Sequence, residues 1–456
     1  MIKQIIDLHI HSKYSRACSK DLELPKIVVA CVGKGIDIVA TSDFTHPLWW
    51  QHIKDCLQEE NSGMFVLKSD QQKLVDSYIE DSDIALPKNI SSRLAFPAGE
   101  VTLSGIDKVR FILSTEISCI YKHKDATRRL HLIILAPDFS AVEKFNGALE
   151  KRGVNLKSDG RPIMGLQAKE ILKIMLDIDD RMMMIPAHAW TPWFSVFGSK
   201  SGYGSLEQCF EELTPHVRAI ETGLSSDPMM NHRLSALDKI TLVSNSDAHS
   251  LNNLGREANV FAFEDEKKIT YDEIKRIIET GDKEKFLYTI EFYPEEGKYH
   301  CDGHRECKIC LEPKETKKAN YICSKCKKKV TVGVLHRIDD LADRELNDIK
   351  KDKFISHKYI VPLREIIGRV FSVGSKSKKV NHEYEKMIRN IGNEFYVLIS
   401  ASQKEIMENT SNKNIWIAIN NMRQEKVKVK PGYDGEFGLV DVLPEGIIKP
   451  NQNRLF

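Results

Sequence analysis

The stretch DLHIHS, residues 7–12, ends the first apolar run of the chain and decides the fold that we expect. In a β-strand, residues two apart share a face, so Asp7, His9 and His11 converge while the residues between them point the other way. Convergent imidazole and carboxylate groups are what a metal ion needs. Histidines satisfied by hydrogen bonds in a core are the alternative, because a lone His-x-His pair is a modest signal.

Short apolar stretches that end in polar residues alternate with helical stretches up to about residue 290. This alternation predicts an α/β domain whose site gathers at the carboxyl ends of parallel strands. The expected strands cover residues 5–11, 37–43, 110–118, 129–137, 181–190, 217–222, 240–249 and 259–263, with helices near 24–35 and 168–178.

The composition is that of an ordinary globular protein. A chain of 456 residues is too long for one compact core, so two or three domains are expected. No apolar run reaches the length of a bilayer span, and the N-terminus enters a strand without a signal sequence, so we expect a cytoplasmic protein with no membrane partner. No heptad pattern argues for more than a monomer.

Cysteines and charges divide the chain near residue 296. Of the ten cysteines, five are scattered singly and five lie within residues 301–326, which does not suit a secreted disulfide scaffold. Residues 1–296 hold 36 Lys+Arg and 44 Asp+Glu, a net charge of −8, and residues 297–456 hold the remaining 31 and 21, a net charge of +10. The first part suits an acidic metal enzyme and the second part suits contact with phosphates.

Imidazoles and carboxylates recur at successive strand ends, in more copies than one metal ion can use. This excess predicts a site for two or three ions of Zn²⁺, Mn²⁺ or Mg²⁺, whose identity the ligand types do not settle. Two such cations polarise a phosphoryl oxygen and lower the pKa of a bound water, which is the chemistry of phosphoester hydrolysis. Taken singly, His46 or His131 would more often be structural. The full set is His9, His11, Asp43, His46, Glu116, His131, His188, Asp247 and His249.

The segment after residue 300 carries two Cys-x-x-Cys pairs separated by twelve residues. Each pair presents two thiolates, and two pairs close a tetrahedral site, so the spacing predicts a structural Zn²⁺ held by four cysteines. A redox pair is the alternative, but it has no reason to be doubled. Cys301, with His300 and His304, stays unassigned. The predicted zinc ligands are Cys307, Cys310, Cys323 and Cys326.

Lysines with aromatic neighbours follow the cysteines, as in KETKKANYICSKCKKKV and EKVKVKPGYDGEF. Clustered lysines can follow a phosphodiester backbone by counterion release, and rings can stack on bases. A single lysine run is usually only a solvated face, but the +10 balance beside a phosphoesterase favours nucleic acid.

The domains that we expect follow from these patterns. Residues 1–295 form a metal-dependent phosphoesterase domain, in which 47–110 is an insertion, either a lid or a solvated excursion. Residues 296–335 form a zinc-binding module, and residues 336–456 form a basic C-terminal α/β domain that binds DNA.

DLHIHS, the TSD turn at 41–43, the lone Glu116 and the SDAH motif at 246–249 resemble the polymerase and histidinol phosphatase (PHP) superfamily over roughly residues 1–290. The resemblance implies a distorted seven-stranded α/β barrel with a trinuclear metal site. It implies that one metal is held by His9, His11, Glu116 and Asp247, a second by Glu116, His131 and His188, and a third by His249 with Asp43.

One departure from the superfamily concerns Arg16, which stands in HSKYSRACS where many relatives have an acidic residue or histidine. The turn TSD also replaces the more usual TDH. Arg16 is a candidate for binding a substrate phosphate, since its fork matches two phosphate oxygens, and a structural salt bridge is the alternative.

The order of a PHP barrel, DFTHPLWW, AHAWTPWFSVFGSKSGYGSLE, a cysteine ribbon and KPGYDGEFG resembles the endonuclease Q family over nearly the entire chain. The resemblance implies a DNA repair enzyme that nicks double- or single-stranded DNA 5′ to hypoxanthine, uracil, xanthine or an abasic site. We expect His9, His11, Glu116 and Asp247 to be catalytic.

An enzyme that reads one damaged base would flip it into a pocket, which aromatic residues near the motifs could line. The candidates for substrate contact are Arg16, His46, Trp190, Trp193, Ser199 and Lys200, with further aromatic candidates at Trp49, Trp50, Phe194, Phe197 and Tyr203.

Two other functions remain open. A PHP phosphatase acting on a small phosphomonoester would suit the acidic first part, but it explains neither the cysteine segment nor the basic tail. A DNA-binding or polymerase-associated module would have a metal site that is structural or serves proofreading, and the intact ligand set argues against an inactive site.

The terminal NQNRLF, residues 451–456, only faintly resembles a peptide that binds a sliding clamp.

Overall fold

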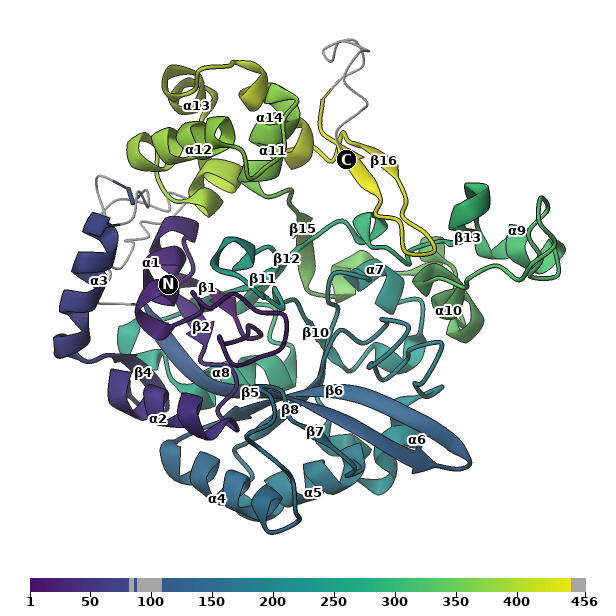
Figure 1. Ribbon diagram of the computed structural model, residues 1–456, viewed down its shortest axis with the longest axis horizontal. Coiled ribbons are helices and arrows are strands. Elements are labelled where there is room, and N and C mark those ends of the chain that lie inside the picture. Colours follow the sequence, from purple (N-terminus) through teal and green to yellow (C-terminus); the bar gives the residue numbers. More distant parts are fainter. Residues whose placement is uncertain (82–85, 88–108, 444–456) are drawn as a thin grey trace.

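Seven strands form a distorted barrel in the computed structural model, which describes residues 1–81, 86–87 and 109–443 (Figure 1). The strands β1, β2 and β5 run parallel, β6 and β8 continue the wall antiparallel, and β9 and β10 pair in parallel. Ala189 N donates to Glu221 O at 2.9 Å between β8 and β9, and a bridge between Ile10 and Ala248 closes the circle. The bounds are β1 (Ile2–Asp7), β2 (Ile38–Ala40), β5 (Arg110–His123), β6 (Ala126–Ala136), β8 (Met183–Pro186), β9 (Ala219–Glu221) and β10 (Thr241–Val243).

Amphipathic helices cover the outside of the barrel. In α8 (Tyr271–Thr280), the Thr270 hydroxyl accepts the N–H of Glu273, and Gly281 ends the helix in the left-handed conformation. Its apolar stripe, which includes Ile274 and Ile277, is fully buried, and this burial drives the docking of the helix. The other covering helices are α1 (Leu24–Lys34), α2 (Pro47–Cys56), α4 (Phe139–Glu150), α5 (Ala168–Ile178), α6 (Leu206–Phe210) and α7 (Pro228–Asn231).

The sheet extends beyond the barrel on both sides of β1 and β5. On one side β11 (Ala258–Phe263) and β12 (Phe286–Glu291) add antiparallel strands, and β15 (Ser356–Tyr359) pairs in parallel with β12. On the other side β4 (Met64–Leu67) and β3 (Leu57–Asn61) lie antiparallel to their neighbours. The C-terminal part of the chain therefore contributes a strand to the same sheet as the N-terminus. The short β7 (Ile163–Met164) pairs with β5.

The cysteine-rich segment is a small unit beside the barrel. It holds the hairpin β13 (Asp302–His304) and β14 (Ile309–Leu311), followed by α9 (Pro313–Lys318) and α10 (Val334–Leu341). Figure 1 shows this unit next to the hairpin of β16 (Lys428–Lys430) and β17 (Leu439–Asp441). The Cys301–Tyr433 bridge joins the two.

Helices dominate the remainder of the C-terminal part. These are α11 (Leu363–Phe371), α12 (Lys378–Asn390), α13 (Gln403–Asn409) and α14 (Asn414–Arg423), with a π-helical turn at Tyr396–Ser400. A buried ion pair joins them to the barrel, because Lys34 Nζ on α1 lies 2.8 Å from Glu394 Oε2. At the neighbouring Gly35 a Cβ would lie 2.5 Å from the Asn393 side chain, so α1 ends in close contact with this bundle.

The expected α/β fold class, with a distorted barrel and a cysteine cluster, is confirmed. The described part of the expected insertion contains α2, β3, β4 and α3 (Ser69–Asp81), while residues 82–85, 88–108 and NQNRLF at 451–456 lie outside the described residues. Among the residues that the structure describes, no helix is both long and apolar enough to cross a bilayer.

Candidate metal centre and cysteine cluster

Glu116 lies at the centre of the polar strand ends. It sits midway along β5 and is fully buried. Its Oε1 atom lies 2.8 Å from His131 Nδ1, 3.3 Å from His188 Nε2 and 3.6 Å from His9 Nε2. Its Oε2 atom lies 3.5 Å from His11 Nε2. Imidazoles that follow β1 and β8 and one from the middle of β6 therefore surround one carboxylate.

Asp247 and His249 complete the centre from the end of β10. The Asp247 Oδ1 atom lies 2.9 Å from His11 Nε2, 3.7 Å from His9 Nε2 and 3.6 Å from His249 Nδ1. The rings of His11 and His249 lie 4.5 Å apart between centroids. The Ile10–Ala248 bridge sets this register, because it places the two strand ends side by side.

Asp43 occupies a different position from the one that the superfamily implied. Its Oδ2 atom accepts hydrogen bonds from Ser12 N at 2.9 Å and Ser15 Oγ at 2.7 Å, while Oδ1 lies 3.5 Å from His11 Nδ1. A Cβ at Gly160 would lie 2.3 Å from Asp43 Oδ2, so only glycine fits there. Asp43 thus holds His11 from behind, on the side away from Glu116.

Three overlapping groups of side chains have ligand atoms within 4.8 Å of one another. The buried atom His9 Nε2 has no hydrogen-bond partner among the described residues, which is unusual for a buried imidazole nitrogen. The imidazole nitrogens of His9 and His11 lie 3.5–3.7 Å from carboxylate oxygens of Glu116 and Asp247, which is too long for good hydrogen bonds. Such distances suit ligand atoms that bind the same cation. The residues therefore fit metal ions. The groups are His9, His11 and Glu116; Glu116, His131 and His188; and His11, Asp247 and His249.

Backbone strain gathers at the same residues. Asp43, His188 and Asp247 have φ angles of 44°, 30° and 47°, in the left-handed region that non-glycine residues rarely adopt. Each of them follows the end of a strand, where the chain turns so that its side chain projects into the barrel mouth. Strain of this kind persists where the surrounding structure holds a functional geometry.

Glu221, which the sequence analysis did not single out, braces two of the histidines. Its Oε1 atom lies 3.0 Å from His9 Nδ1 and accepts a hydrogen bond from Asn245 Nδ2 at 2.9 Å. Its Oε2 atom accepts the N–H of His188 at 2.7 Å. The sequence could have indicated Glu221, because it is a polar residue at the end of a strand, β9, as several of the predicted ligands are.

Arg161 is a second residue that the sequence analysis missed. Its guanidinium donates to Glu116 Oε2 at 2.9 Å from the loop before β7. This loop offers no strand or helix pattern, so no signal in the sequence could have placed Arg161 at the centre. The guanidinium brings a positive charge to the edge of the cluster, where an anionic ligand would meet it.

Protonation differs among the buried groups. Burial lowers the pKa of His131 to about 4, against the pull of Glu116, so this imidazole is neutral and free to bind a metal. Burial also disfavours the charged form of His9, but Glu221 and Glu116 outweigh it and raise the pKa of His9. Burial opposes ionisation of Glu116, yet the charge of Arg161 and the hydrogen bond from His131 hold the pKa of Glu116 well below its usual range.

The substrate candidates lie in different environments. Trp190 is fully buried and donates to Asn231 Oδ1 at 2.7 Å, so it is a core residue. Trp193 is exposed on the loop after His188, and the exposed Lys200 follows it. Trp49, Trp50, Phe197 and Tyr203 are likewise buried, and Phe194 packs its ring 4.7 Å from that of His131.

Two other candidates, Arg16 and His46, lie near the turn after β1, and a third, Ser199, lies on the loop after Trp193. The Arg16 side chain is exposed, and among the described residues no ion pair to it was found. His46 is buried, its ring stacks on Tyr14 at 4.4 Å, and its Nδ1 atom has no described partner. Ser199, on the loop after Trp193, also has a buried hydroxyl without a described partner.

The cysteine cluster contains a histidine that we did not expect. Ligand atoms of His304, Cys307, Cys323 and Cys326 lie within 4.8 Å of one another, whereas Cys310 is not in the group. His304 Nε2 lies 3.7 Å from Cys326 Sγ. The set therefore differs from the predicted four cysteines by one exchange, His304 for Cys310.

Backbone geometry explains this exchange. Lys308, directly after Cys307, has φ 52°, and Lys327, directly after Cys326, has φ 62°. The two turns H-x-x-C-K and C-x-x-C-K therefore match, and each presents two ligands before its left-handed residue. Cys310 instead lies on β14, opposite Gly303 of β13. Three cysteines and one histidine suit a closed structural Zn²⁺ site.

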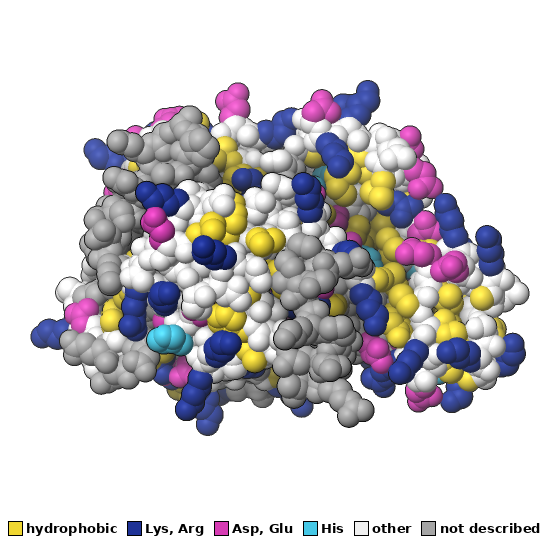
Figure 2. Space-filling view, turned by 90° about the horizontal axis from the view of Figure 1, so that it is seen from above, with side chains coloured by type: hydrophobic (Ala, Val, Ile, Leu, Met, Phe, Trp, Pro, Cys, Tyr) yellow, Lys and Arg dark blue, Asp and Glu magenta, His cyan; other side chains and the backbone are white. Residues whose placement is uncertain are grey.

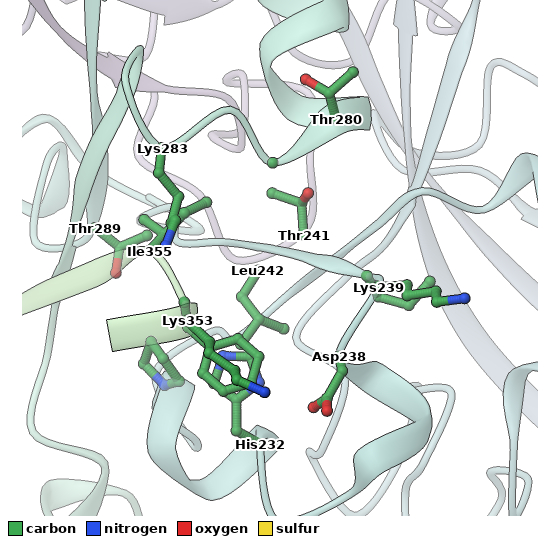
Figure 3. Close-up of a pocket in the computed structure, with 14 residues that line it drawn as sticks. His232, Asp238, Lys239, Thr241, Leu242, Thr280, Lys283, Thr289, Lys353 and Ile355 are labelled. Atoms are coloured by element: carbon green, nitrogen blue, oxygen red, sulfur yellow. The ribbon is translucent and has the colours of Figure 1, made fainter. Parts of the chain in front are cut away.

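A separate cavity of about 230 Å³ lies at the other end of β10 (Figure 3). It is lined by Thr241 and Leu242, which begin that strand, whereas Asp247 lies beyond its end. The ring of His232 stacks on Phe354 at 3.6 Å in its wall. None of the site residues expected from the sequence lines this cavity, so it is distinct from the metal centre.

Comparison with known sequences gives relatives of undefined function. The model of the MJ0043 C-terminal domain matches residues 362–426. Uncharacterized protein MJ0043 of Methanocaldococcus jannaschii is 30% identical over 57% of this chain, and the match spans only 32% of that relative. Uncharacterized protein YqxK of Bacillus subtilis is 25% identical over 68% of this chain and 73% of its own length.

Solved structures give a match over nearly the whole chain. The lesion-specific endonuclease PfuEndoQ of Pyrococcus furiosus is 28% identical, with a TM-score of 0.79 over 98% of this chain and 96% of its own. Endonuclease Q in complex with a 27-mer duplex that carries an abasic lesion at the active site is 29% identical, with a TM-score of 0.77 over 98% of each chain. The resemblance to endonuclease Q that the sequence indicated is confirmed.

Proposed function

We propose that this chain is a DNA repair endonuclease that hydrolyses the phosphodiester 5′ to deaminated bases and abasic sites. The observation that carries the proposal is the match over 98% of the chain to endonuclease Q bound to a lesion-containing duplex. Both matched structures are endonucleases, as the sequence led us to expect, and the groups of ligand atoms at the barrel mouth support metal dependence. Hypoxanthine, uracil, xanthine and abasic sites are the substrates that we propose.

We propose three metal positions at the barrel mouth, each held by one of the three groups of ligand atoms. Glu116 belongs to the first and second groups, and its two oxygens would serve two ions. His11 belongs to the first and third groups and would give its Nε2 atom to one ion. Bound Zn²⁺, Mn²⁺ or Mg²⁺ ions would polarise the phosphoryl oxygen, lower the pKa of a bound water and stabilise the leaving oxygen. Asp43 and Glu221 fix the orientation of the histidines from behind.

The cationic side chains position the scissile phosphate. Arg161 is held at Glu116 by one N–H group, so its remaining donors are available to a phosphate oxygen at the edge of the cluster. Arg16 lies exposed on the turn after His11, where it would meet a neighbouring phosphate of the strand. These two residues bind and orient the substrate, and the carboxylate of Glu116 keeps Arg161 in place.

The damaged base is flipped out of the duplex to bring its phosphate to the metals, and Trp193 and Lys200 contact the displaced strand. We assign residues 1–295 to catalysis, residues 296–335 to a structural Zn²⁺ module and residues 336–456 to DNA binding. The protein acts as a monomer, and a contact with a sliding clamp through NQNRLF would be additional.

Nicking of end-labelled duplexes tests the proposal. Each duplex contains one deoxyinosine, one deoxyuridine, one abasic site or no lesion, and each is incubated with Mg²⁺, Mn²⁺ or Zn²⁺. The wild type is expected to cut 5′ to the lesion and the His9→Ala variant is not. Equal cutting of the undamaged duplex would make the protein a general nuclease. Turnover of p-nitrophenyl phosphate without any nicking would instead support a phosphomonoesterase.

A further inference from the structure

Resting on the proposed function, we infer that Phe437 is a wedge that enters the DNA stack next to the flipped nucleotide. Phe437 is 74% exposed, which is the highest exposed fraction among the large hydrophobic side chains of the described residues. It belongs to the KPGYDGEFG loop (residues 430–438) between β16 and β17. An exposed phenylalanine on a loop tip is costly to leave in water unless it meets a partner.

The KPGYDGEFG loop is rigid, so the ring of Phe437 is presented in a fixed direction. The N–H groups of Gly432, Gly435 and Gly438 donate to carbonyl oxygens of residues 295–298 at 2.8, 2.9 and 3.1 Å. A Cβ at Gly438 would lie 2.1 Å from a carbonyl oxygen of that segment, and one at Gly432 would lie 2.4 Å from another. Glycine is therefore required for the loop to lie flat against this backbone.

A carboxylate ties the same loop to the cysteine cluster. Asp434 Oδ2 accepts the N–H of Arg305 at 2.7 Å, and Oδ1 accepts the hydroxyl of Thr331 at 2.6 Å. Arg305 follows His304 directly, so the proposed Zn²⁺ site holds the residue on which the loop is anchored. This anchoring gives the zinc module a role in presenting Phe437.

A chain of contacts leads from Phe437 to the metal centre. The Lys298 ammonium lies 4.4 Å from the centroid of the Phe437 ring, and the next residue, Tyr299, lies 5.7 Å from Trp193 between ring centroids. Thr191 Oγ1 lies 3.1 Å from His188 Nδ1 and donates to Trp193 O at 2.9 Å. These contacts connect the loop that carries Phe437 to the loop that carries Trp193 and, through Thr191, to the ligand His188.

The charge of this surface suits a nucleic acid backbone. Lys428 and Lys430 are exposed on β16 and Lys426 is exposed just before it, and residues 297–456 carry the net charge of +10. Figure 2 shows a hollow between the lobe at the right, which is the cysteine-rich unit by its place in Figure 1, and the rest of the molecule. Hydrophobic side chains line this hollow, and both basic and acidic side chains lie along its border. The basic side chains suit contact with phosphates, and the apolar lining suits contact with bases.

A wedge explains why an apolar ring accompanies these lysines. Extrusion of a nucleotide leaves a gap in the stack, and an inserted apolar side chain replaces part of the lost stacking. The phenyl ring carries no hydrogen-bonding group, so it would act equally on different neighbouring bases. Trp193, which lies nearer to His188, is then left to contact the displaced nucleotide.

The test uses a duplex with one abasic site and 2-aminopurine as the neighbouring base. Insertion of Phe437 separates 2-aminopurine from its neighbours, so binding of the wild type is expected to raise its fluorescence. Phe437→Ala is expected to lose most of this rise and to nick the duplex about tenfold more slowly under single-turnover conditions. On a single strand with the same lesion, which has no stack to enter, its rate is expected to stay within twofold of the wild type.

The control is Leu439→Ala, which removes another exposed apolar side chain from the same hairpin and is expected to behave as the wild type. Phe437→Trp is expected to retain the fluorescence rise. A full rise with Phe437→Ala, or equal losses on duplex and single strand, would overturn the wedge. A rise that depends on Phe437 without any nicking would support the wedge and reject the proposed reaction, so the two failures are distinguishable.

Discussion

The carboxylate of Glu221 lies behind the imidazole of His9, with Oε1 3.0 Å from Nδ1, while Nε2 of the same ring faces Glu116. Because Nδ1 is engaged, the Nε2 atom is the one left for a metal ion. A carboxylate that orients a metal-binding histidine also raises the basicity of the ring. Glu221 therefore shapes the centre without being one of the proposed ligands.

Glu221→Gln is expected to lower metal affinity and the nicking rate by about 10- to 100-fold, since the amide keeps the shape but loses the charge that supports His9. Metal content after dialysis and single-turnover nicking measure the two effects. Glu207→Gln, an exposed position on α6, is the matched control. Unchanged metal affinity in Glu221→Gln would contradict this role.

Glu116→Gln is expected to reduce nicking by about 1,000-fold, which corresponds to ~4 kcal/mol of barrier, because the bridging charge between two ions is removed. It should also release Arg161, so the Michaelis constant for DNA rises. The comparison is with Glu150→Gln, an exposed substitution on α4. Near wild-type nicking by Glu116→Gln would mean that this carboxylate does not bridge metals.

Two substitutions can show whether His304 or Cys310 is the fourth zinc ligand. His304→Ala is expected to lose one Zn²⁺ per chain and to lower the melting temperature, whereas Cys310→Ser keeps its zinc because Cys310 lies outside the ligand group. His304→Cys should restore binding, since a thiolate is also a tetrahedral ligand. Metal analysis and thermal melts measure this, and the reverse outcome would restore the four-cysteine set.

Stability is expected to fall as pH rises from about 4.5 to about 8 through Glu291. Burial raises the pKa of this carboxyl to about 8, with Asp227 adding to the shift, although the Thr222 hydroxyl donates to Oε2 at 3.1 Å. The folded protein keeps the proton in this window and the unfolded chain loses it. The stabilisation is thus fully present below pH 4.5 and is lost as pH approaches 8.

Glu291→Gln, which is neutral at every pH, is expected to flatten this dependence by ~3 kcal/mol between pH 5 and pH 8. Urea denaturation at several pH values measures the free energy of unfolding. The exposed substitution Glu284→Gln should leave the slope as in the wild type. A slope that is the same in Glu291→Gln and the wild type would show that other groups cause it.

The metal centre could be predicted where strand geometry determines it. His9 and His11 are two residues apart, so the strand period alone places them together, and Glu116, His131, His188 and Asp247 share the same end of the barrel. Asp43 lies at the same end, but its contacts with Ser12 and Ser15 turn it toward the outer side of His11. Those contacts depend on the turn after β1, which a strand pattern does not describe.

The remaining residues depend on contacts that are distant in sequence or on backbone angles. Arg161 reaches Glu116 across 45 positions from a loop without periodicity. His304 and Cys310 each stand three residues from Cys307, one before it and one after it, so spacing alone permits either to be a ligand. The left-handed residue Lys308 decides between them, and φ angles are not visible in a spacing pattern.

The pairing of β15 with β12 has a consequence for how the chain can be divided. Removal of the C-terminal part would leave β12 as an edge strand with unpaired N–H and C=O groups, and Lys34 would lose its buried partner Glu394. A truncated catalytic barrel would therefore tend to aggregate. The barrel and the C-terminal part therefore share a sheet and a buried ion pair, and recombination that exchanged the C-terminal part would have to supply both a strand and a carboxylate.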